Sequence, residues 1–173
     1  QAILDMMSLH EKFGKLKGLK VGIIGDISHS RVALSNIYGF LIMGAEVTLC
    51  GPPNLIPPFI KDLGVNINYN VDEVIEWADA LNVLRIQRER MGLGLVPSNR
   101  EYRAMFGITQ ERLESHKKEI VIMHPGPMNR GVEIDGAVAD GDQAIILDQV
   151  LNGVASRMAI LYLLCGGKSS EEG

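Results

Sequence analysis

Two arginines lie at positions that favour anion binding. Arg31 follows the turn Gly25–Ser30, which carries two serine hydroxyls, and opens an apolar helical pattern. The first turn of a helix offers unpaired backbone N–H groups that suit a carboxylate or phosphate, although a serine here can also act only as a cap. Arg85 lies inside an apolar run, Ala80–Ile86, where an unpaired charge would be costly. Arg85 is therefore expected to meet a buried acid or to point into a ligand crevice.

The residues after Arg85 extend this pattern. Gln87 lies two positions further on, so the two side chains share one face of an extended strand. A guanidinium and a carboxamide at this spacing can hold a dicarboxylate through paired hydrogen bonds. The following stretch, Arg88–Arg103, is basic and interrupted by glycine. Such a stretch is commonly a solvated face, but its place after this strand predicts a loop that closes over a ligand.

A third segment contains the turn Pro125-Gly126-Pro127. Proline has no backbone N–H, so this turn presents mainly carbonyl oxygens, which suit an ammonium or amide group. His124, just before the turn, is a candidate base, although a histidine at the end of a strand is more often structural. The three segments together predict a site for an amino dicarboxylate. They show no nucleophile–base pair, metal cluster or cofactor cradle, and we expect no cofactor.

Short apolar runs and helical patterns alternate along the chain. The runs are Leu19–Gly25, Ala45–Gly51, Val65–Tyr69, Ala80–Ile86 and Glu119–His124, and the helical patterns between them are Arg31–Met43, Asn54–Leu63 and Val71–Ala78. Runs rich in Val, Ile and Leu without alternation indicate parallel strands covered on both faces. The prediction is an α/β three-layer sandwich with a five-stranded parallel sheet of Rossmann-like type. In the common strand orders, the loops after strands one, four and five meet at one edge.

The two ends of the chain carry further helical patterns. Gln1–Phe13 lacks a capping residue before it, which suggests a helix cut inside a longer chain. Asp142–Leu164 is predicted to be a long amphipathic helix that packs along the sheet or reaches toward a second domain. We therefore expect one domain over residues 1–165, in which helices 1–13 and 142–165 connect to an absent domain. A disordered tail over 166–173 is expected to follow.

Composition excludes several classes of protein. Apolar residues make up 46% and charged residues 22%, which supports a packed core. The net charge of −4 argues against nucleic-acid binding, and no apolar segment is long enough to predict a membrane span. Cys50 and Cys165 are interpreted as buried thiols, and the expected location is the cytoplasm. The turn after the first strand lacks the dinucleotide fingerprint, which disfavours an NAD-dependent dehydrogenase.

Taken together, the motifs resemble the aspartate carbamoyltransferase family, and in particular its C-terminal half, over Gln1–Leu164. The matching segments are Gln1–Asp5, Gly25–Asp26, Ser30–Val32, Arg85–Arg90, His124–Pro127 and Asn129–Ile134. The resemblance implies transfer of a carbamoyl group from carbamoyl phosphate to L-aspartate in pyrimidine biosynthesis. It also implies that Arg31 and Arg85, assisted by Gln87, bind the aspartate carboxylates.

The same resemblance implies a second set of residues, at carbamoyl phosphate. These are Gln1, Gly126 and Pro127, with the carbonyls of Pro125 and Gly126 receiving amino groups. The family's phosphate-binding loop and the groups donated by a neighbouring subunit have no counterpart here. We therefore assign no catalytic residue and expect the chain alone to be inactive. Implied partners are two further copies in a homotrimer, with regulatory chains or dihydroorotase as additional possibilities.

Two alternatives stay open. Ornithine carbamoyltransferase is disfavoured because its typical Ser-Met-Gly loop is replaced by Arg85-Ile86-Gln87, and its His-Cys-Leu-Pro turn by His124–Pro127. A stand-alone α/β module that binds a small anion or a nucleotide would use the same helix end and arginines without any second domain.

Overall fold

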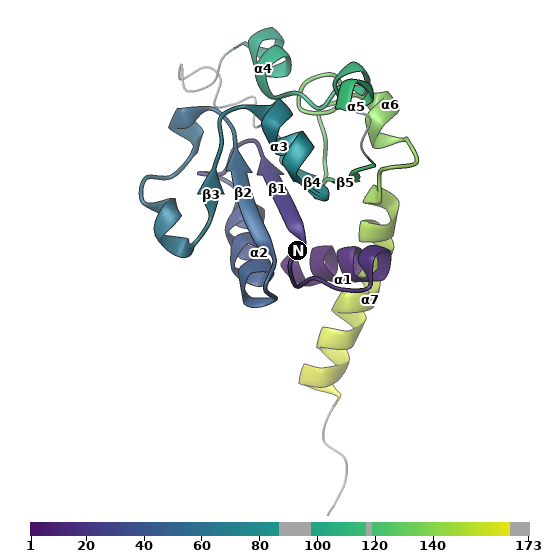
Figure 1. Cartoon of the computed structure of the whole chain (residues 1–173). Coiled ribbons are helices and arrows are strands. Elements are labelled where there is room, and N and C mark those ends of the chain that lie inside the picture. Colours follow the sequence, from purple (N-terminus) through teal and green to yellow (C-terminus); the bar gives the residue numbers. More distant parts are fainter. Residues whose placement is uncertain (87–97, 117–118, 167–173) are drawn as a thin grey trace, which may run out of the picture.

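A computed structural model describes residues 1–86, 98–116 and 119–166 (Figure 1). Within these residues the strands are β1 (Lys20–Ile24), β2 (Glu46–Cys50), β3 (Asn66–Ile67), β4 (Ala80–Val83) and β5 (Val121–Met123). They form one parallel sheet in the order β3-β2-β1-β4-β5. The predicted five-stranded parallel sheet is therefore confirmed, with strands shorter than the apolar runs.

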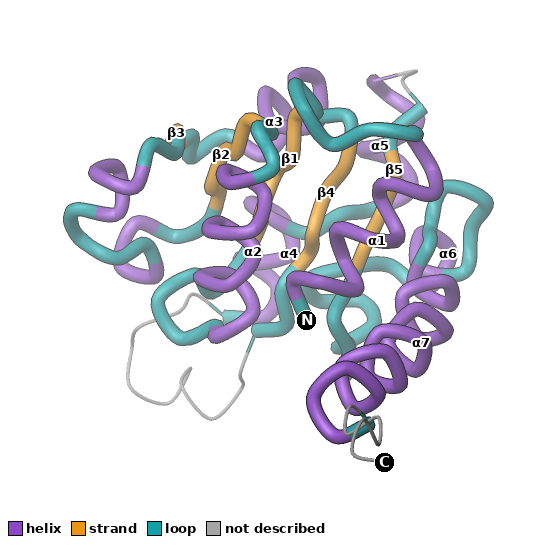
Figure 2. The backbone as a smooth tube through the Cα atoms, turned by 90° about the horizontal axis from the view of Figure 1, so that it is seen from below, coloured by secondary structure: helices purple, strands orange, loops and turns teal. Residues whose placement is uncertain are grey.

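Helices cover both faces of the sheet, as the three-layer prediction requires. They are α1 (Ala2–Phe13), α2 (Arg31–Ile42), α3 (Val71–Trp77), α4 (Asn99–Phe106), α5 (Gln110–His116), α6 (Gly136–Ala139) and α7 (Ile146–Cys165), with short 3-10 turns η1 (Pro53–Leu55) and η2 (Ile60–Leu63). One apolar core lies between the sheet and the helices α1 and α2. The other lies on the opposite face, beneath α3, α4 and α6. Figure 2 shows the sheet between these layers.

The register of the sheet brings three loops to one edge. Ile24 pairs with Val83 across β1 and β4, and Asn82 pairs with Met123 across β4 and β5. The loops after β1, β4 and β5 therefore leave the sheet side by side, as predicted. Gly25 has φ 127°, and a Cβ there would lie 3.0 Å from the carbonyl oxygen of Leu84. Glycine is needed at this position because the two loops approach closely.

Two helix predictions are wrong in extent. Asn54–Leu63 forms η1 and η2 rather than one α-helix, because Pro57 and Pro58 interrupt the backbone hydrogen bonds between them. The helix predicted from Asp142 begins only at Ile146. The backbone just before it pairs with β5 instead. The Ile122 amide donates to the Gln143 carbonyl at 2.8 Å, and the Ile145 amide donates to the Ile122 carbonyl at 2.9 Å.

Helix α7 buries a polar face and exposes an apolar one. Its buried residues are Gln149, Asn152 and Gly153. Its exposed apolar side chains are Leu147, Val150, Leu151, Val154, Met158, Ile160, Leu161, Tyr162, Leu163 and Leu164. Figure 1 shows its C-terminal half extending beyond the rest of the domain. Of the two alternatives for this helix, packing of its apolar side along the sheet is not observed.

The predictions for the two cysteines have different outcomes. Cys165, at the end of α7, is exposed, so its interpretation as a buried thiol is wrong; Cys50, at the end of β2, is buried as predicted. Residues 167–173 of the predicted tail lie outside the described part. In that part, no helix combines the length and apolarity that crossing a membrane requires.

Candidate functional site at the carboxyl edge of the sheet

Arg31 lies at the first turn of α2, where the sequence placed it. The Ser30 side chain caps the helix by accepting a hydrogen bond from the Ala33 amide at 3.1 Å. The Arg31 side chain is exposed and makes no hydrogen bond or ion pair with the rest of the described chain. It lines a pocket of about 230 Å³ together with the loop after β1. Serine thus acts as the cap, and the arginine stays available for a ligand.

A buried acid shapes the loop before Arg31. Asp26 is buried and accepts hydrogen bonds from the backbone N–H of His29 at 3.2 Å and from the ring Nδ1 of His29 at 2.8 Å. The Ser28 amide donates to the carbonyl of Leu55 at 2.8 Å, which ties this loop to η1. The loop is therefore held from two sides, and the start of α2 keeps a fixed position at the edge of the sheet.

Arg85 lies two residues beyond β4 and is half-buried. Its Nε atom is buried and has no hydrogen-bond partner in the described chain. Of the two roles expected for Arg85, pairing with an internal acid finds no support among these residues. A buried guanidinium nitrogen without a partner at the ligand edge is what a site awaiting an anion would present.

The predicted closing loop is described only at its C-terminal end. Gln87 and residues 88–97 lie outside the described residues. Ser98 and Glu101 form a reciprocal capping box at the start of α4. These bonds to Ser98 hold the pKa of the Glu101 carboxyl below its usual value. Arg103 forms an ion pair with Asp135, which raises the pKa of Arg103 and anchors α4 to the segment before α6.

His124 braces the turn that follows β5. It is buried, and its Nδ1 accepts a hydrogen bond from the Gly126 amide at 2.8 Å. The proton of the neutral ring must then sit on Nε2, which lies 3.5 Å from the carboxylate of the buried Glu133. Gly126 has φ 64°, a value that favours glycine. His124 therefore has the structural role, and its bond to Gly126 uses one of the few amides that the turn has.

Gln1 lies beside this turn. A pocket of about 250 Å³ is lined by Gln1, Pro125 and Gly126 together with residues of α7, including Arg157. Pro127 follows in the same turn but does not line the pocket. Three of the four residues expected at carbamoyl phosphate are thus brought together. Arg31 lines a different pocket, so the two expected groups of ligand-binding residues occupy separate parts of the edge.

The loops after β4 and β5 are tied to each other. The side-chain amide of Asn129 donates to the carbonyl of Ile86 at 2.9 Å and to the Glu133 carboxylate at 3.2 Å. Tyr102 of α4 is fully buried, and burial, followed by the nearby charge of Glu133, raises the pKa of Tyr102 well above its usual value. Its phenol therefore stays neutral. These contacts give the Arg85 segment a fixed support.

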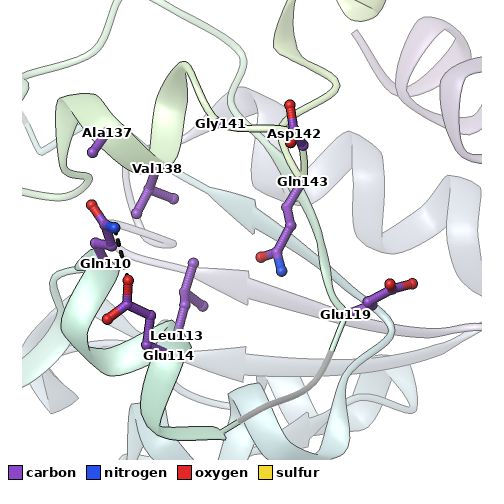
Figure 3. A pocket seen from close by; sticks show the side chains of 9 residues that line it. All are labelled: Gln110, Leu113, Glu114, Glu119, Ala137, Val138, Gly141, Asp142 and Gln143. Carbon is purple, nitrogen blue, oxygen red and sulfur yellow. Dashed lines mark hydrogen bonds between the residues drawn. The ribbon is translucent and has the colours of Figure 1, made fainter.

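Another pocket lies away from this edge. It is lined by residues of α5 and α6 and by the segments at 119 and 141–143, and its volume is about 490 Å³ (Figure 3). Glu119 precedes β5, so this pocket adjoins the amino end of that strand. Its ionisable side chains are acidic: Glu114, Glu119 and Asp142. An acidic lining does not suit a dicarboxylate.

Several buried polar residues were not predicted. Asp5, Gln149 and Glu133 all contact groups around the turn after β5, directly or through one further residue. Asn36 and Asn82 are also buried, within patterns that are otherwise apolar. A polar residue at a position that the periodicity places in the core was the signal available for both asparagines.

Comparison with known proteins agrees with this geometry. The family model described as aspartate/ornithine carbamoyltransferase, Asp/Orn binding domain, matches residues 17–164. The chain belongs to this family. The aspartate carbamoyltransferase catalytic subunit of Moorella thermoacetica is 59% identical over 167 residues, which cover 96% of this chain and 54% of that protein. That of Carboxydothermus hydrogenoformans is 57% identical and is covered to 55%.

Solved structures of the family show the same fold. The catalytic subunit of M. jannaschii aspartate transcarbamoylase, in an orthorhombic crystal form, superposes with a TM-score of 0.79 at 30% identity, covering 98% of this chain and 56% of that chain. Ornithine carbamoyltransferase from Pyrococcus furiosus gives a TM-score of 0.80 at 24% identity, which shows the fold alone. The chain spans about half the length of the curated relatives that it matches.

Proposed function

We propose that this chain is the aspartate-binding half of an aspartate carbamoyltransferase, which acts on L-aspartate and carbamoyl phosphate in pyrimidine biosynthesis. The observation that carries the proposal is Arg85, whose buried Nε has no hydrogen-bond partner among residues 1–86, 98–116 and 119–166 and lies at the carboxyl edge of the sheet. Arg31 is exposed on the neighbouring loop. Arg31 and Arg85, with Gln87, supply the positive charge and hydrogen bonds that a dicarboxylate requires.

Carbamoyl phosphate is proposed to bind at the other end of this edge. Gln1 and the carbonyls of Pro125 and Gly126 offer an amide and two acceptors for the carbamoyl amino group, with Pro127 alongside. The aspartate amine then attacks the carbamoyl carbon, a C–N bond forms, the bond to the phosphate oxygen breaks, and the amine loses a proton. Orientation of two bound reactants is a large part of such catalysis. Groups that stabilise the leaving phosphate are proposed to come from outside this chain.

The exposed face of α7 is proposed to contact the part that the longer relatives have in addition. Leu147, Leu151 and Leu161 are exposed by 83%, 69% and 62%, and the pocket at Gln1 opens beside the same helix. Large exposed apolar patches commonly mark interfaces. We propose that the complete protein is a cytoplasmic homotrimer, and that the isolated chain is inactive.

The test joins residues 1–173 to the amino-terminal half of the Moorella thermoacetica relative, giving a completed catalytic chain. Formation of carbamoyl aspartate is measured with aspartate or ornithine as acceptor. We expect activity with aspartate only, and none from residues 1–173 alone. Arg85→Ala should raise the KM for aspartate by about 100-fold, because charge-assisted hydrogen bonds are lost.

Lys12→Ala is the matched control, since it removes one exposed positive charge from α1. It should leave the KM values for aspartate and for carbamoyl phosphate within about twofold of those of the completed chain. An Arg85→Ala variant with the aspartate KM of the completed chain would remove Arg85 from the site. Carbamoylation of ornithine by the completed chain would overturn the assignment of the substrate.

A further inference from the structure

A buried carboxylate lies at the junction of four elements. Asp5 of α1 has no exposed surface, and its Oδ1 accepts a hydrogen bond from the Gln1 side chain at 2.8 Å and from Gln149 of α7 at 2.7 Å. Its Oδ2 accepts from Asn36 of α2 at 2.7 Å and from Asn82 of β4 at 3.4 Å. We call these five residues the Asp5 cluster. Figures 1 and 2 show α1 and α7 against each other beside the sheet.

The chemistry of the Asp5 cluster favours an ionised carboxylate. All four donors are side-chain amides, and a protonated carboxyl would direct an O–H at one of them. Burial raises the pKa of Asp5, while the hydrogen bonds from Asn36, Gln149 and Gln1 oppose that rise. The cluster is therefore specific: each amide must present its N–H₂ group to Asp5, and this fixes the direction in which its oxygen points.

That fixed direction matters most at Gln149. With its N–H₂ on Asp5, its Oε1 accepts a hydrogen bond from the His124 backbone amide at 3.0 Å. His124 in turn accepts from the Gly126 amide through Nδ1 at 2.8 Å. A continuous chain of hydrogen bonds therefore runs from Asp5 to the turn at 124–127. The same carboxylate also holds the side chain of Gln1, which lines the pocket that this turn borders.

We propose that Asp5 and Gln149 are positioning residues that align Gln1 with the turn at 124–127, and so form the carbamoyl-phosphate end of the site. This inference rests on the proposed function. Gln149 itself lines the pocket at Gln1, whereas Asp5 does not line it and acts only through the residues that it holds. Asp5 binds the Gln1 side chain directly, and it binds Gln149, which in turn binds the turn at 124–127. Gln1 and the turn are therefore positioned by the same carboxylate. Residues placed through a shared support keep the precise geometry that orientation of the reactants requires.

The chain supplies a matched control on the same helix. Asn152 lies one turn beyond Gln149, is also buried, and also bonds α7 to α1, through Ser8 at 3.0 Å and Glu11 at 2.7 Å. It has no hydrogen bond to the turn at 124–127. Gln149→Met and Asn152→Leu each replace a buried amide by an apolar side chain of similar size. They should therefore destabilise the contact between the helices by comparable amounts.

The experiment uses the completed catalytic chain and measures the thermal midpoint and both KM values for each variant. Both variants should lower the midpoint. Only Gln149→Met should raise the KM for carbamoyl phosphate, by about tenfold for one lost alignment, with the aspartate KM changed less than threefold. If Gln149→Met and Asn152→Leu change the KM for carbamoyl phosphate equally, Gln149 supports the helix only and the inference is wrong.

A second variant keeps the test decisive if Gln149→Met does not fold. Gln149→Glu places a second carboxyl against Asp5, and because two adjacent charges repel, the pair gains one shared proton as the pH falls. The protonated form can still donate to Asp5 and accept from His124, so the KM for carbamoyl phosphate should recover as the pH is lowered toward 6. If the KM of this variant for carbamoyl phosphate changes with pH no more than that of the parent, the inference is wrong. Absence of all activity in the unchanged completed chain contradicts the proposed function instead.

Discussion

Helices α2 and α7 bury opposite kinds of face: α2 buries a mainly apolar face and α7 a polar one. Helix α2 buries Ala33, Ile37 and Phe40 against the sheet, with Asn36 as a buried polar residue among them. Helix α7 buries Gln149 and Asn152, which hydrogen-bond to α1, and exposes its leucines to the surroundings.

The difference shows that one kind of contact stabilises a helix and another kind fixes its orientation. Apolar burial is non-directional, so α2 gains stability from area removed from water with little constraint on rotation. Hydrogen bonds are directional, so the amides of α7 fix its register against α1 even though it buries little apolar surface. A helix that adjoins a ligand-binding turn gains more from alignment, and its apolar face stays available for another surface.

The largest expected effect is in the α2 core. Phe40→Ala removes a fully buried ring and should lower the free energy of unfolding by about 3–5 kcal/mol. Urea denaturation followed by circular dichroism measures this difference. A loss below 1 kcal/mol would mean that α2 is not held by apolar burial, and the contrast with α7 would disappear.

The next effect probes the close approach of α7 to α1. A Cβ at Gly153 would lie 3.4 Å from a methyl group of Leu4, which is ordinary contact. Gly153→Ala should therefore fold as well as the parent, with a gain of up to about 1 kcal/mol in helix propensity. Gly153→Leu should cost about 1–3 kcal/mol because the larger side chain separates the helices. Equal stability of both variants in urea would show that the interface is loose.

Local signals made α2 predictable and left α7 incompletely predicted. The predicted range Arg31–Met43 matches α2 closely because Ser30 and Gly44 mark its ends within a few residues. The start of α7 depends on pairing of Gln143–Ile145 with β5, a contact distant in sequence. Its buried face was left open, because periodicity shows that one side is apolar and does not show whether that side faces the core.

The candidate site was predictable to the extent that topology decides it. Parallel strands and a common strand order place Arg31, Arg85 and the turn at 125–127 at one edge, and the structure has this arrangement. The links of Asp5 to Asn82 and Gln149 join residues that lie far apart in the chain. No spacing rule predicts such links, because they depend on the final packing of α1 against β4 and α7.

Substitutions on the outward face of α7 should have a small effect on stability. Leu161 is 62% exposed, so Leu161→Ser should change the free energy of unfolding by no more than about 0.5 kcal/mol. It should, however, reduce self-association of the isolated chain, as measured by light scattering, because it interrupts the exposed apolar face. A loss of stability above 1 kcal/mol would show that this face is packed within the chain.

The smallest expected effect is chemical rather than energetic, and it compares the two cysteines. Burial raises the pKa of Cys50 to about 12, so at pH 8 its thiolate population is on the order of one in ten thousand. Cys165 is exposed at the end of α7. A thiol reagent at pH 8 should therefore label one cysteine per folded chain and two after unfolding. Raising the pH from 7 to 9 should leave Cys50 unlabelled, because Cys50 stays protonated below its raised pKa. Labelling of Cys50 at the rate of Cys165 would show that the core at the end of β2 is as accessible to the reagent as the outer end of α7. The expected difference between the two regions would then be wrong.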